Sequence, residues 1–423
     1  MNLLKKLIRR LIVGKEQEFA FKKVQIDTFC IPNIKKSSMY IHVPFCKSMC
    51  PYCPYNRVQY DEKLIAGYFN ALSEEIDLYS KKLGKIEISS IYIGGGTPTN
   101  AIDELIVIIE KIKDKFYVEG DIAIETTVED ATNETLLKLK LAGINMISIG
   151  IQSFNEKYLR ILGRNYSGKD IENAIENTKK HEFDNVNIDI MFAFPGQTDE
   201  EILDDIKRAK QTNADQITTY PLFTFPYSTI GTYLKIKKLK MPDFIDRKSF
   251  YYLIYDYFKT HNYKTVSVWS FKKSNTEKKY SSVTRDYYIG LGAGAASRIG
   301  KMFYFNTFSI SEYNNRLLNE KKLPVSVNMS ITDKLSKIYW FYWKLYETRF
   351  SEHDFNSIAD RKMKFIVKIF YCLKLIKKQE GIYKMTKRGA FWIHFFQNHF
   401  MLEYINKVWS IMKNNKYPEK IKF

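Results

Sequence analysis

The sequence predicts an α/β protein with a parallel sheet, and two observations carry this prediction. Short runs rich in β-branched residues recur through the first half of the chain, and an amphipathic segment separates each run from the next. Glycine and polar residues gather directly after these runs, as they do at the carboxyl ends of parallel strands. Six strand–helix units are too few for a closed eight-stranded barrel, so we expect a partial, open barrel or a doubly wound sheet.

The individual elements follow in order from local pattern. Runs of Ile, Val, Tyr and Thr predict strands at 39–43, 89–93, 122–126, 146–150, 186–192 and 216–220. Apolar residues at helical spacing predict the intervening helices at 61–80, 101–115, 133–141, 169–181 and 199–211.

The second half of the chain has a different pattern, dominated by Tyr, Phe and Lys. A helix is expected at 244–261, and a glycine-rich stretch follows at 288–300. From about residue 331 the chain reads as all-helical, and a basic helix, a glycine turn and "MTKRG" within 375–392 are typical of a winged-helix-type module. We therefore divide the chain into an N-terminal basic segment (1–35), a core (36–300) and a smaller, mainly helical C-terminal domain (301–423).

Charge and composition narrow the class of partner. The chain has 423 residues and a formal net charge of +19, which favours anionic partners such as nucleic acid, acidic lipid or a polycarboxylate small molecule. No stripe of arginine and aromatic residues of the kind that binds single strands is present, so nucleic acid is disfavoured. Aromatic residues make up 15% of the chain, which suits a core of large rings and, in part, a flat ligand surface.

The expected location follows from apolar runs and cysteine usage. The sequence contains no run of 18 apolar residues, so it predicts no membrane-spanning helix. Five cysteines, an odd number, do not suggest a disulfide framework, so a reducing, cytoplasmic compartment is expected. The N-terminal "MNLLKKLIRRLIVGK" alternates apolar and basic pairs, and it predicts either a helix docked on the domain or a peripheral helix on an anionic membrane.

Three of the five cysteines, Cys46, Cys50 and Cys53, lie within eight positions directly after the first expected strand. Soft thiolates bind zinc or iron–sulfur clusters, and a structural zinc site needs four closed ligands. No second cysteine pair or histidine pair completes such a site, and His42 at the end of the strand reads as a packed core residue. A four-iron cluster held by three cysteines leaves one iron open for a substrate or cofactor, so the spacing CxxxCxxC predicts a 4Fe–4S cluster.

These cysteines and four further motifs resemble the radical S-adenosylmethionine (SAM) family of oxygen-independent coproporphyrinogen III oxidases and the related haem chaperones. The motifs are "YIHVPFCKSMCPYC" (40–53), "IYIGGGTPT" (91–99), "GIQSF" (150–154), "NIDIMFAFPGQT" (187–198) and "YIGLGAGAAS" (288–297). The resemblance implies a partial parallel (β/α)6 barrel in which the three cysteines hold the cluster. It also implies that the open iron binds SAM, that SAM cleavage yields a 5′-deoxyadenosyl radical, and that a reduced flavodoxin- or ferredoxin-type protein donates the electron.

By the same resemblance, two groups of residues contact SAM. The residues expected at the cluster-bound molecule are Tyr40, Tyr52, Gly95 and Glu125, with Phe223 and Ala296 as further contacts. The residues that match a second SAM site are Gly96, Thr97, Gln152, Arg164 and Asp189. Arg164 and Asp189 would bring both charge signs to a sulfonium that carries a carboxylate, and a purely structural Arg–Asp pair is the alternative. For Glu125 the alternative is a carboxylate on the protein surface. The sequence identifies no catalytic residue.

The chain departs from the oxidase pattern after the third cysteine, where Tyr55 stands in place of a further cysteine. The segments "SVWSFKK" (267–273) and "YSSVTRDYY" (280–288) more nearly resemble branches tied to haem utilisation, in which radical methyl transfer opens the haem ring. Three functions stay open. They are radical chemistry on an anionic tetrapyrrole as in the oxidase, radical SAM methyl transfer in haem utilisation or degradation, and a haem-binding chaperone without oxidase activity.

Overall fold

The computed structural model describes residues 20–423 apart from 226–227 and 282–285, so the basic stretch at the N-terminus lies outside the described residues. Its central feature is a run of parallel strands that pair in chain order. These strands are β2 (Lys36–Val43), β5 (Glu87–Gly95), β6 (Tyr117–Thr127), β7 (Met146–Gln152), β8 (Asn185–Phe192) and β9 (Gln216–Pro221). Because the order never reverses, the run is an arc of a barrel and not a doubly wound sheet. The α/β prediction and its six strands are confirmed.

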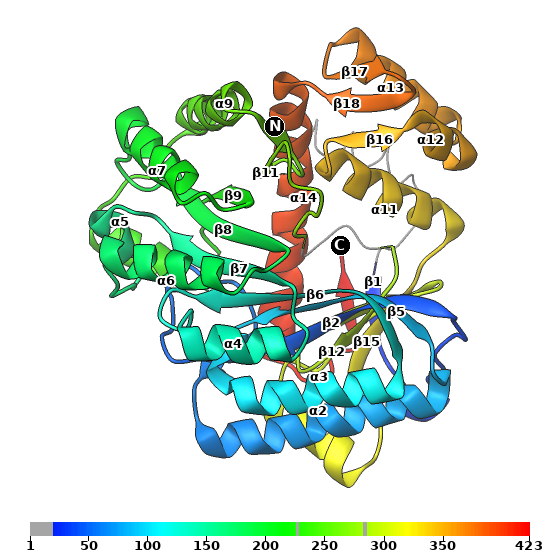
Figure 1. Ribbon diagram of the computed structural model, residues 1–423. Coiled ribbons are helices and arrows are strands. Elements are labelled where there is room, and N and C mark those ends of the chain that lie inside the picture. The colour runs from blue at the N-terminus through cyan, green and yellow to red at the C-terminus, as the bar shows by residue number, and fades with distance from the viewer. Residues whose placement is uncertain (1–19, 226–227, 282–285) are drawn as a thin grey trace.

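Helices return the chain between these strands and cover their outer face, as α2, α3 and α4 show in Figure 1. The returning helices are α2 (Glu62–Leu83), α3 (Ile102–Lys115), α4 (Asn133–Leu141), α6 (Gly168–Lys180) and α7 (Asp199–Gln211). Polar caps begin several of them: Asp61 caps α2, and Ser167 and Thr198 each form a capping box. A short helix, α5 (Glu156–Ile161), was not expected, because six residues are too few to show a helical period.

The sheet continues beyond both edges of the parallel run. Strand β12 (Tyr288–Leu291) pairs parallel with β2 and is followed outward by antiparallel strands. These are β13 (Ala296–Ile299), β14 (Met302–Asn306), β15 (Val325–Ser330), β1 (Ala20–Lys23) and β19 (Lys420–Lys422). At the opposite edge, β9 pairs antiparallel with β11 (Ser270–Lys273), which pairs with β10 (Tyr263–Thr265). The described N-terminal and C-terminal strands therefore pair side by side at one end of a single mixed sheet.

The part of the chain from residue 333 onward forms a module of helices with a small antiparallel sheet. Its helices are α11 (Asp333–Tyr346), α12 (Glu352–Ile358), α13 (Arg361–Cys372) and α14 (Lys387–Met412), and its strands are β16 (Arg349–Ser351), β17 (Ile376–Gln379) and β18 (Ile382–Met385). The all-helical expectation from residue 331 is therefore wrong in detail. Strands of three or four residues are too short to show alternation, and only the turn at Gly381 marked the hairpin of β17 and β18.

Helix α14 joins this module to the barrel. It crosses the middle of the molecule and packs against α11 and against α9 (Phe244–Thr260), as Figure 1 shows. Like every other described helix, it is not apolar enough over a sufficient length to cross a lipid bilayer.

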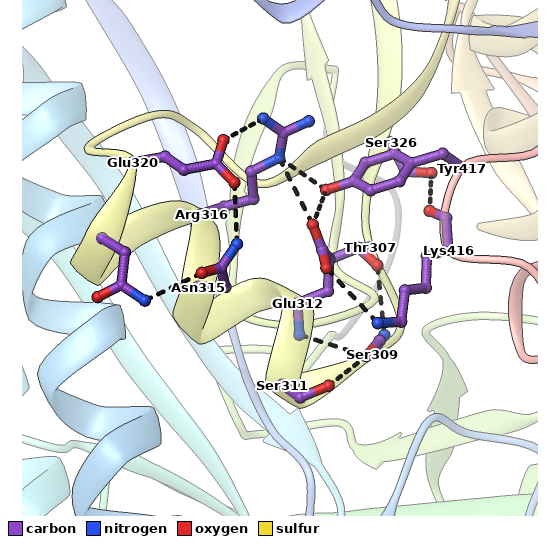
Figure 2. Close-up of polar contacts among 11 residues, drawn as sticks. Thr307, Ser309, Ser311, Glu312, Asn315, Arg316, Glu320, Ser326, Lys416 and Tyr417 are labelled. Atoms are coloured by element: carbon purple, nitrogen blue, oxygen red, sulfur yellow. Dashed lines mark hydrogen bonds and ion pairs between the residues drawn. The ribbon is translucent and has the colours of Figure 1, made fainter.

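The segment after α14 is fixed to the barrel by polar contacts (Figure 2). The Tyr417 hydroxyl donates to Glu312 at 2.8 Å and accepts from Arg316 Nε at 2.7 Å. Ser326 donates its hydroxyl proton to the Lys416 carbonyl at 2.6 Å, after which the chain enters β19. Because α14 is anchored at its end as well as along its length, its side chains hold a fixed place beside the barrel.

Candidate functional site

The three motif cysteines lie in a loop that leaves the carboxyl end of β2. Cys46 and Cys50 are buried, and Cys53 is partly exposed to a cavity. The base of the loop is closed by β3 (Phe45–Cys46) and β4 (Val58–Gln59), which pair parallel. This closure holds the three thiols in one place at the rim of the barrel.

Arg57 stabilises the cysteine loop from within. Its guanidinium donates a hydrogen bond to the Cys50 carbonyl. Burial raises the pKa of the Cys46 thiol to about 11, with a further increase from Cys53, while Thr97 and Arg57 act in the opposite direction. The metal-free site therefore holds a protonated thiol at Cys46, and metal binding has to displace that proton.

The residues present fit an iron–sulfur cluster. Among the described residues, no three His, Cys, Asp or Glu side chains converge on a single metal ion. Three soft thiols suit a larger cluster, in which separate irons each take one thiolate. The glycines of "GGGTPT" leave room for the cysteine loop: a Cβ on Gly96 would lie 2.7 Å from the Phe45 carbonyl oxygen and 3.0 Å from Cys46 Sγ. From the sequence alone, a glycine triplet indicates little more than a turn. The structure shows why glycine is needed at Gly96: the cysteine loop approaches the backbone too closely for a side chain.

His42 orders the strand that precedes the cysteines. Its Nε2 lies 2.7 Å from the Asn56 carbonyl oxygen, so this nitrogen carries the proton, and Nδ1 accepts from the Tyr40 hydroxyl at 2.8 Å. Burial lowers the pKa of His42 to about 4, which keeps the ring neutral. His42 is thus the packed core residue that its position at the strand end indicated.

Glu125 lies in the cavity wall and not on the outer surface, so the surface-carboxylate alternative is wrong. It accepts a hydrogen bond of 2.5 Å from the Tyr92 hydroxyl, which in turn accepts one of 2.9 Å from the Tyr280 hydroxyl. Burial raises the pKa of Glu125, and the hydrogen bond from Tyr92 partly offsets the increase. A carboxylate oriented in this way can accept hydrogen bonds from ligand hydroxyl groups.

A cavity of about 500 Å³ lies at the carboxyl ends of the parallel strands. Side chains that follow parallel strands meet at one rim, which is why residues far apart in sequence converge here. The expected site residues that line it are Tyr52, Cys53, Gly95, Gly96, Thr97, Glu125, Gln152, Arg164, Asp189 and Phe223.

Arg164 and Asp189 both line the cavity but do not form the structural pair considered above. Asp189 accepts a hydrogen bond of 2.8 Å from Asn187, whereas Arg164 interacts with the Tyr52 hydroxyl. Burial raises the pKa of Asp189 to about 7, and the nearby Glu125 adds to the increase. Within the described part of the chain, the Nε of Arg164 has no hydrogen-bond partner, so this buried group can still bind a ligand.

Gln152 occupies a strained position in the cavity wall. Its φ of +73° lies in the left-handed region, which costs a residue with a side chain about 1–3 kcal/mol. The Tyr220 hydroxyl holds its side-chain oxygen at 2.7 Å, and Gly150 leaves room for its amide. Strain maintained in this way is typical of a binding site.

Four expected residues do not line the cavity. Cys46 and Cys50 are buried in the loop, and Tyr40 stacks on the cavity residue Tyr92 with ring centroids 6.2 Å apart. Ala296 lies in β13 beside a cluster of aromatic side chains around Phe21, so its predicted SAM contact has no place in this cavity.

The C-terminal module contributes a wall that sequence reasoning missed. The lining residues from α11, α14 and the position after α11 are Tyr342, Trp343, Tyr346, Glu347, His394, Asn398, Met401, Leu402, Ile405 and Trp409. One signal could have indicated this wall. The α14 sequence "FWIHFFQNHFML" is apolar or aromatic on nearly every side, which is typical of a helix buried between other parts of a protein.

Comparison with known proteins identifies similar chains. Residues 40–209 match the family model described as the radical SAM superfamily. The haem chaperone HemW of Bacillus subtilis is 29% identical over 301 residues, which are 70% of this chain and 79% of the relative. The anaerobilin synthase of Escherichia coli O157:H7 is 25% identical over 388 residues, which are 90% of this chain and 86% of the relative.

A solved structure matches nearly the whole fold. The coproporphyrinogen III oxidase HemN of Escherichia coli has a TM-score of 0.76 over 90% of this chain and 94% of that chain, at 19% identity. This likeness confirms the partial barrel with a smaller, mainly helical C-terminal domain.

Proposed function

We propose that this chain is a haem-binding protein of the chaperone type, on the premise that residues 40–209 match the model of the radical SAM superfamily. In this proposal the tetrapyrrole binds against the aromatic wall of the cavity, and the 4Fe–4S cluster and SAM bind at the cysteine loop on its opposite rim. The observation that carries the proposal is the shape of that cavity, which has the cysteine loop on one side and an aromatic wall from α11 and α14 on the other.

The residues proposed for the cofactors are those at the rim of the barrel. Cys46, Cys50 and Cys53 would ligate the cluster, and Gly95 and Glu125 would contact SAM. A cluster held there could pass an electron from an external reductant to SAM, and that chemistry belongs to the second candidate function below, not to the chaperone. We propose one SAM molecule, because the comparisons lend no support to a second one.

The residues that resemble a second SAM site are free, in this proposal, to contact the tetrapyrrole. They are Gly96, Thr97, Gln152, Arg164 and Asp189, and they line the same cavity as the first group. The half-buried Arg164 suits a ring carboxylate, whereas Lys279, also in the wall, is paired with Glu347 at 2.7 Å. Glu125, Asp189 and Glu347 lie there too, so the charge within the cavity is mixed.

The chemistry of the cavity wall supports a tetrapyrrole ligand. Tyr346, Trp343 and Trp269 present aromatic rings to the cavity, and such rings pack well on a flat conjugated ligand.

Two observations favour the chaperone over the oxidase. HemW chaperones are prominent among the relatives, and the one from Bacillus subtilis shares 29% identity with this chain. The position after the cysteine motif that carries a further cysteine in the oxidases is Tyr55 here, and its half-exposed side chain faces the cavity.

A second candidate function is SAM-dependent conversion of the bound haem. It is favoured by the continuity of the cavity, which places the cysteine loop and the aromatic wall around one space. It is also favoured by the anaerobilin synthase of Escherichia coli, whose similarity extends over 90% of this chain.

One anaerobic experiment tests both candidates. The chain is reconstituted with iron and sulfide, loaded with haem, and mixed with dithionite and SAM, while the haem spectrum, 5′-deoxyadenosine and S-adenosylhomocysteine are followed. The chaperone proposal predicts that haem stays bound and intact, that no SAM is consumed, and that haem passes to an apo-haem protein.

The other outcomes identify the alternatives. If both SAM products rise with haem, radical methyl transfer replaces the chaperone function. If 5′-deoxyadenosine alone rises with coproporphyrinogen, the chain is an oxidase. Failure of haem and of metal-free porphyrin to bind would contradict tetrapyrrole binding itself. Arg164→Met is expected to weaken porphyrin binding, whereas the matched Arg160→Met, at a side chain that is 78% exposed, is not.

A further inference from the structure

A buried histidine of helix α14, His394, lies in the wall of the proposed binding cavity. It is 7% exposed and also lines a neighbouring cavity of about 340 Å³. Its ring packs edge-on against Trp269, with ring centroids 4.7 Å apart and an interplanar angle of 89°. Tyr346 lies on another side at 5.7 Å. The imidazole is therefore held among aromatic rings and faces the space where a ligand would bind.

Neither ring nitrogen of His394 has a hydrogen-bond partner within the described part of the chain. Buried polar groups are nearly always paired, so an imidazole with two unpaired nitrogens calls for a ligand. Gln397 lies near the ring: its amide nitrogen donates to the Tyr342 carbonyl at 2.7 Å, and its Oε1, unpaired among the described residues, is an acceptor close to the ring, which still leaves one ring nitrogen open. His42 provides the internal contrast, because the structural histidine uses both of its nitrogens in hydrogen bonds.

The ring of His394 is neutral. Burial lowers the pKa of His394 to about 3, and Gln397 only partly opposes that decrease. A neutral imidazole is the commonest protein ligand for transition metals.

Protein side chains alone do not complete a metal site around this histidine. Among the described residues, no three His, Cys, Asp or Glu side chains are grouped to hold a metal ion. A single histidine suits a metal that arrives with most of its coordination filled, and the iron of a tetrapyrrole arrives with four ring nitrogens.

We infer that His394 is the protein's axial ligand to the iron of a bound tetrapyrrole. The inference rests on the proposed tetrapyrrole binding. It adds a histidine nitrogen that binds the iron of the ring, which a metal-free ring lacks. In this arrangement α14 selects for haem over free porphyrin, while the barrel rim holds the cluster and SAM.

The test compares haem with metal-free protoporphyrin in the whole chain. Both are titrated into the wild type and into His394→Ala, and ligation is followed by difference absorbance, electron paramagnetic resonance and resonance Raman spectroscopy. Removal of a ligand is expected to lower haem affinity by about tenfold or more, since even loss of a supporting outer-shell contact has that effect. Affinity for metal-free protoporphyrin is expected to stay unchanged, and added imidazole is expected to restore the histidine-type spectrum.

Two matched variants sharpen the result. His353→Ala, at a side chain that is 92% exposed on the same module, is expected to behave as wild type. His399→Ala removes another α14 histidine, which lines only the neighbouring cavity, and it is expected to keep the ligation. Should His394→Ala not fold, His394→Gln retains a neutral polar side chain, and the wild-type spectrum alone reports whether a histidine binds iron.

Three results overturn the inference: a wild-type haem complex without a histidine ligand, retained ligation in His394→Ala, or loss of ligation in His399→Ala. In each case porphyrin binding can persist, and the proposed function then stands. If neither haem nor protoporphyrin binds the wild type, the proposed function fails together with the inference.

Discussion

Replacement of Gly96 by alanine offers a direct test of how the barrel supports the cysteine loop. The added Cβ would lie 2.7 Å from the Phe45 carbonyl oxygen, which is 0.7 Å short of the 3.4 Å at which ordinary contact begins. That carbonyl cannot easily retreat, because it accepts the Thr97 amide at 2.9 Å. Overpacking of this kind costs about 1–3 kcal/mol. We expect Gly96→Ala to lose that stability and to displace the loop that carries Cys46.

The matched control is Gly231→Ala in α8 (Ile230–Ile236). No atom lies within 4 Å of the added methyl, and the backbone has no positive φ, so this variant is expected to be as stable as wild type or about 0.5–1 kcal/mol more stable. The assay measures iron and sulfide per chain after anaerobic reconstitution and the melting temperature of the metal-free protein. Full iron content in Gly96→Ala, with a melting temperature equal to the control, would refute the steric argument.

Three further predictions follow from other parts of the molecule. Combined replacement of Cys46, Cys50 and Cys53 by alanine is expected to abolish iron binding and the brown colour of anaerobically purified protein. Retained iron and colour would contradict the cluster assignment, and replacement of the two cysteines outside the motif serves as the control. Burial raises the pKa of Glu75 to about 7 from a usual 4.5, so the folded state binds the proton more tightly and stability falls as pH rises from about 4.5 to about 7. The free energy of unfolding falls by about 3 kcal/mol over this range. When melting temperature is plotted against pH, the wild-type and Glu75→Gln curves should therefore converge or cross. Parallel curves would exclude the proposed titration of Glu75. Tyr417→Phe removes the hydroxyl that joins Glu312 and Arg316, and a loss of about 1–2 kcal/mol is expected in thermal unfolding, with no change expected if the end of α14 is held by packing alone.

Local sequence pattern was sufficient for the six parallel strands and for the residue types that follow them. Each expected strand carries its own β-branched run, and the polar residue that follows, such as Glu125 after β6, meets the others because parallel strands share one carboxyl end. The three cysteines lie within one loop, so their spacing predicts a cluster at Cys46, Cys50 and Cys53 without knowledge of any distant contact. Ala296 shows the limit, since a short antiparallel strand directs it to a different aromatic cluster.

The sequence by itself thus determined the six parallel strands and the three-cysteine loop, and it left an open barrel and a doubly wound sheet as alternatives. Only the tertiary structure decided that α14 forms the far wall of the cavity and brings His394 and Trp409 to it. The physical reason is separation along the chain. The spacing of residues in a sequence indicates contacts only between residues a few positions apart. Helix α14 reaches the rim through packing on α9 and α11 and through the hydrogen bonds of Tyr417, which join distant parts of the chain. An unpaired imidazole is invisible in a sequence, because whether a buried nitrogen has a partner depends on every element packed around it.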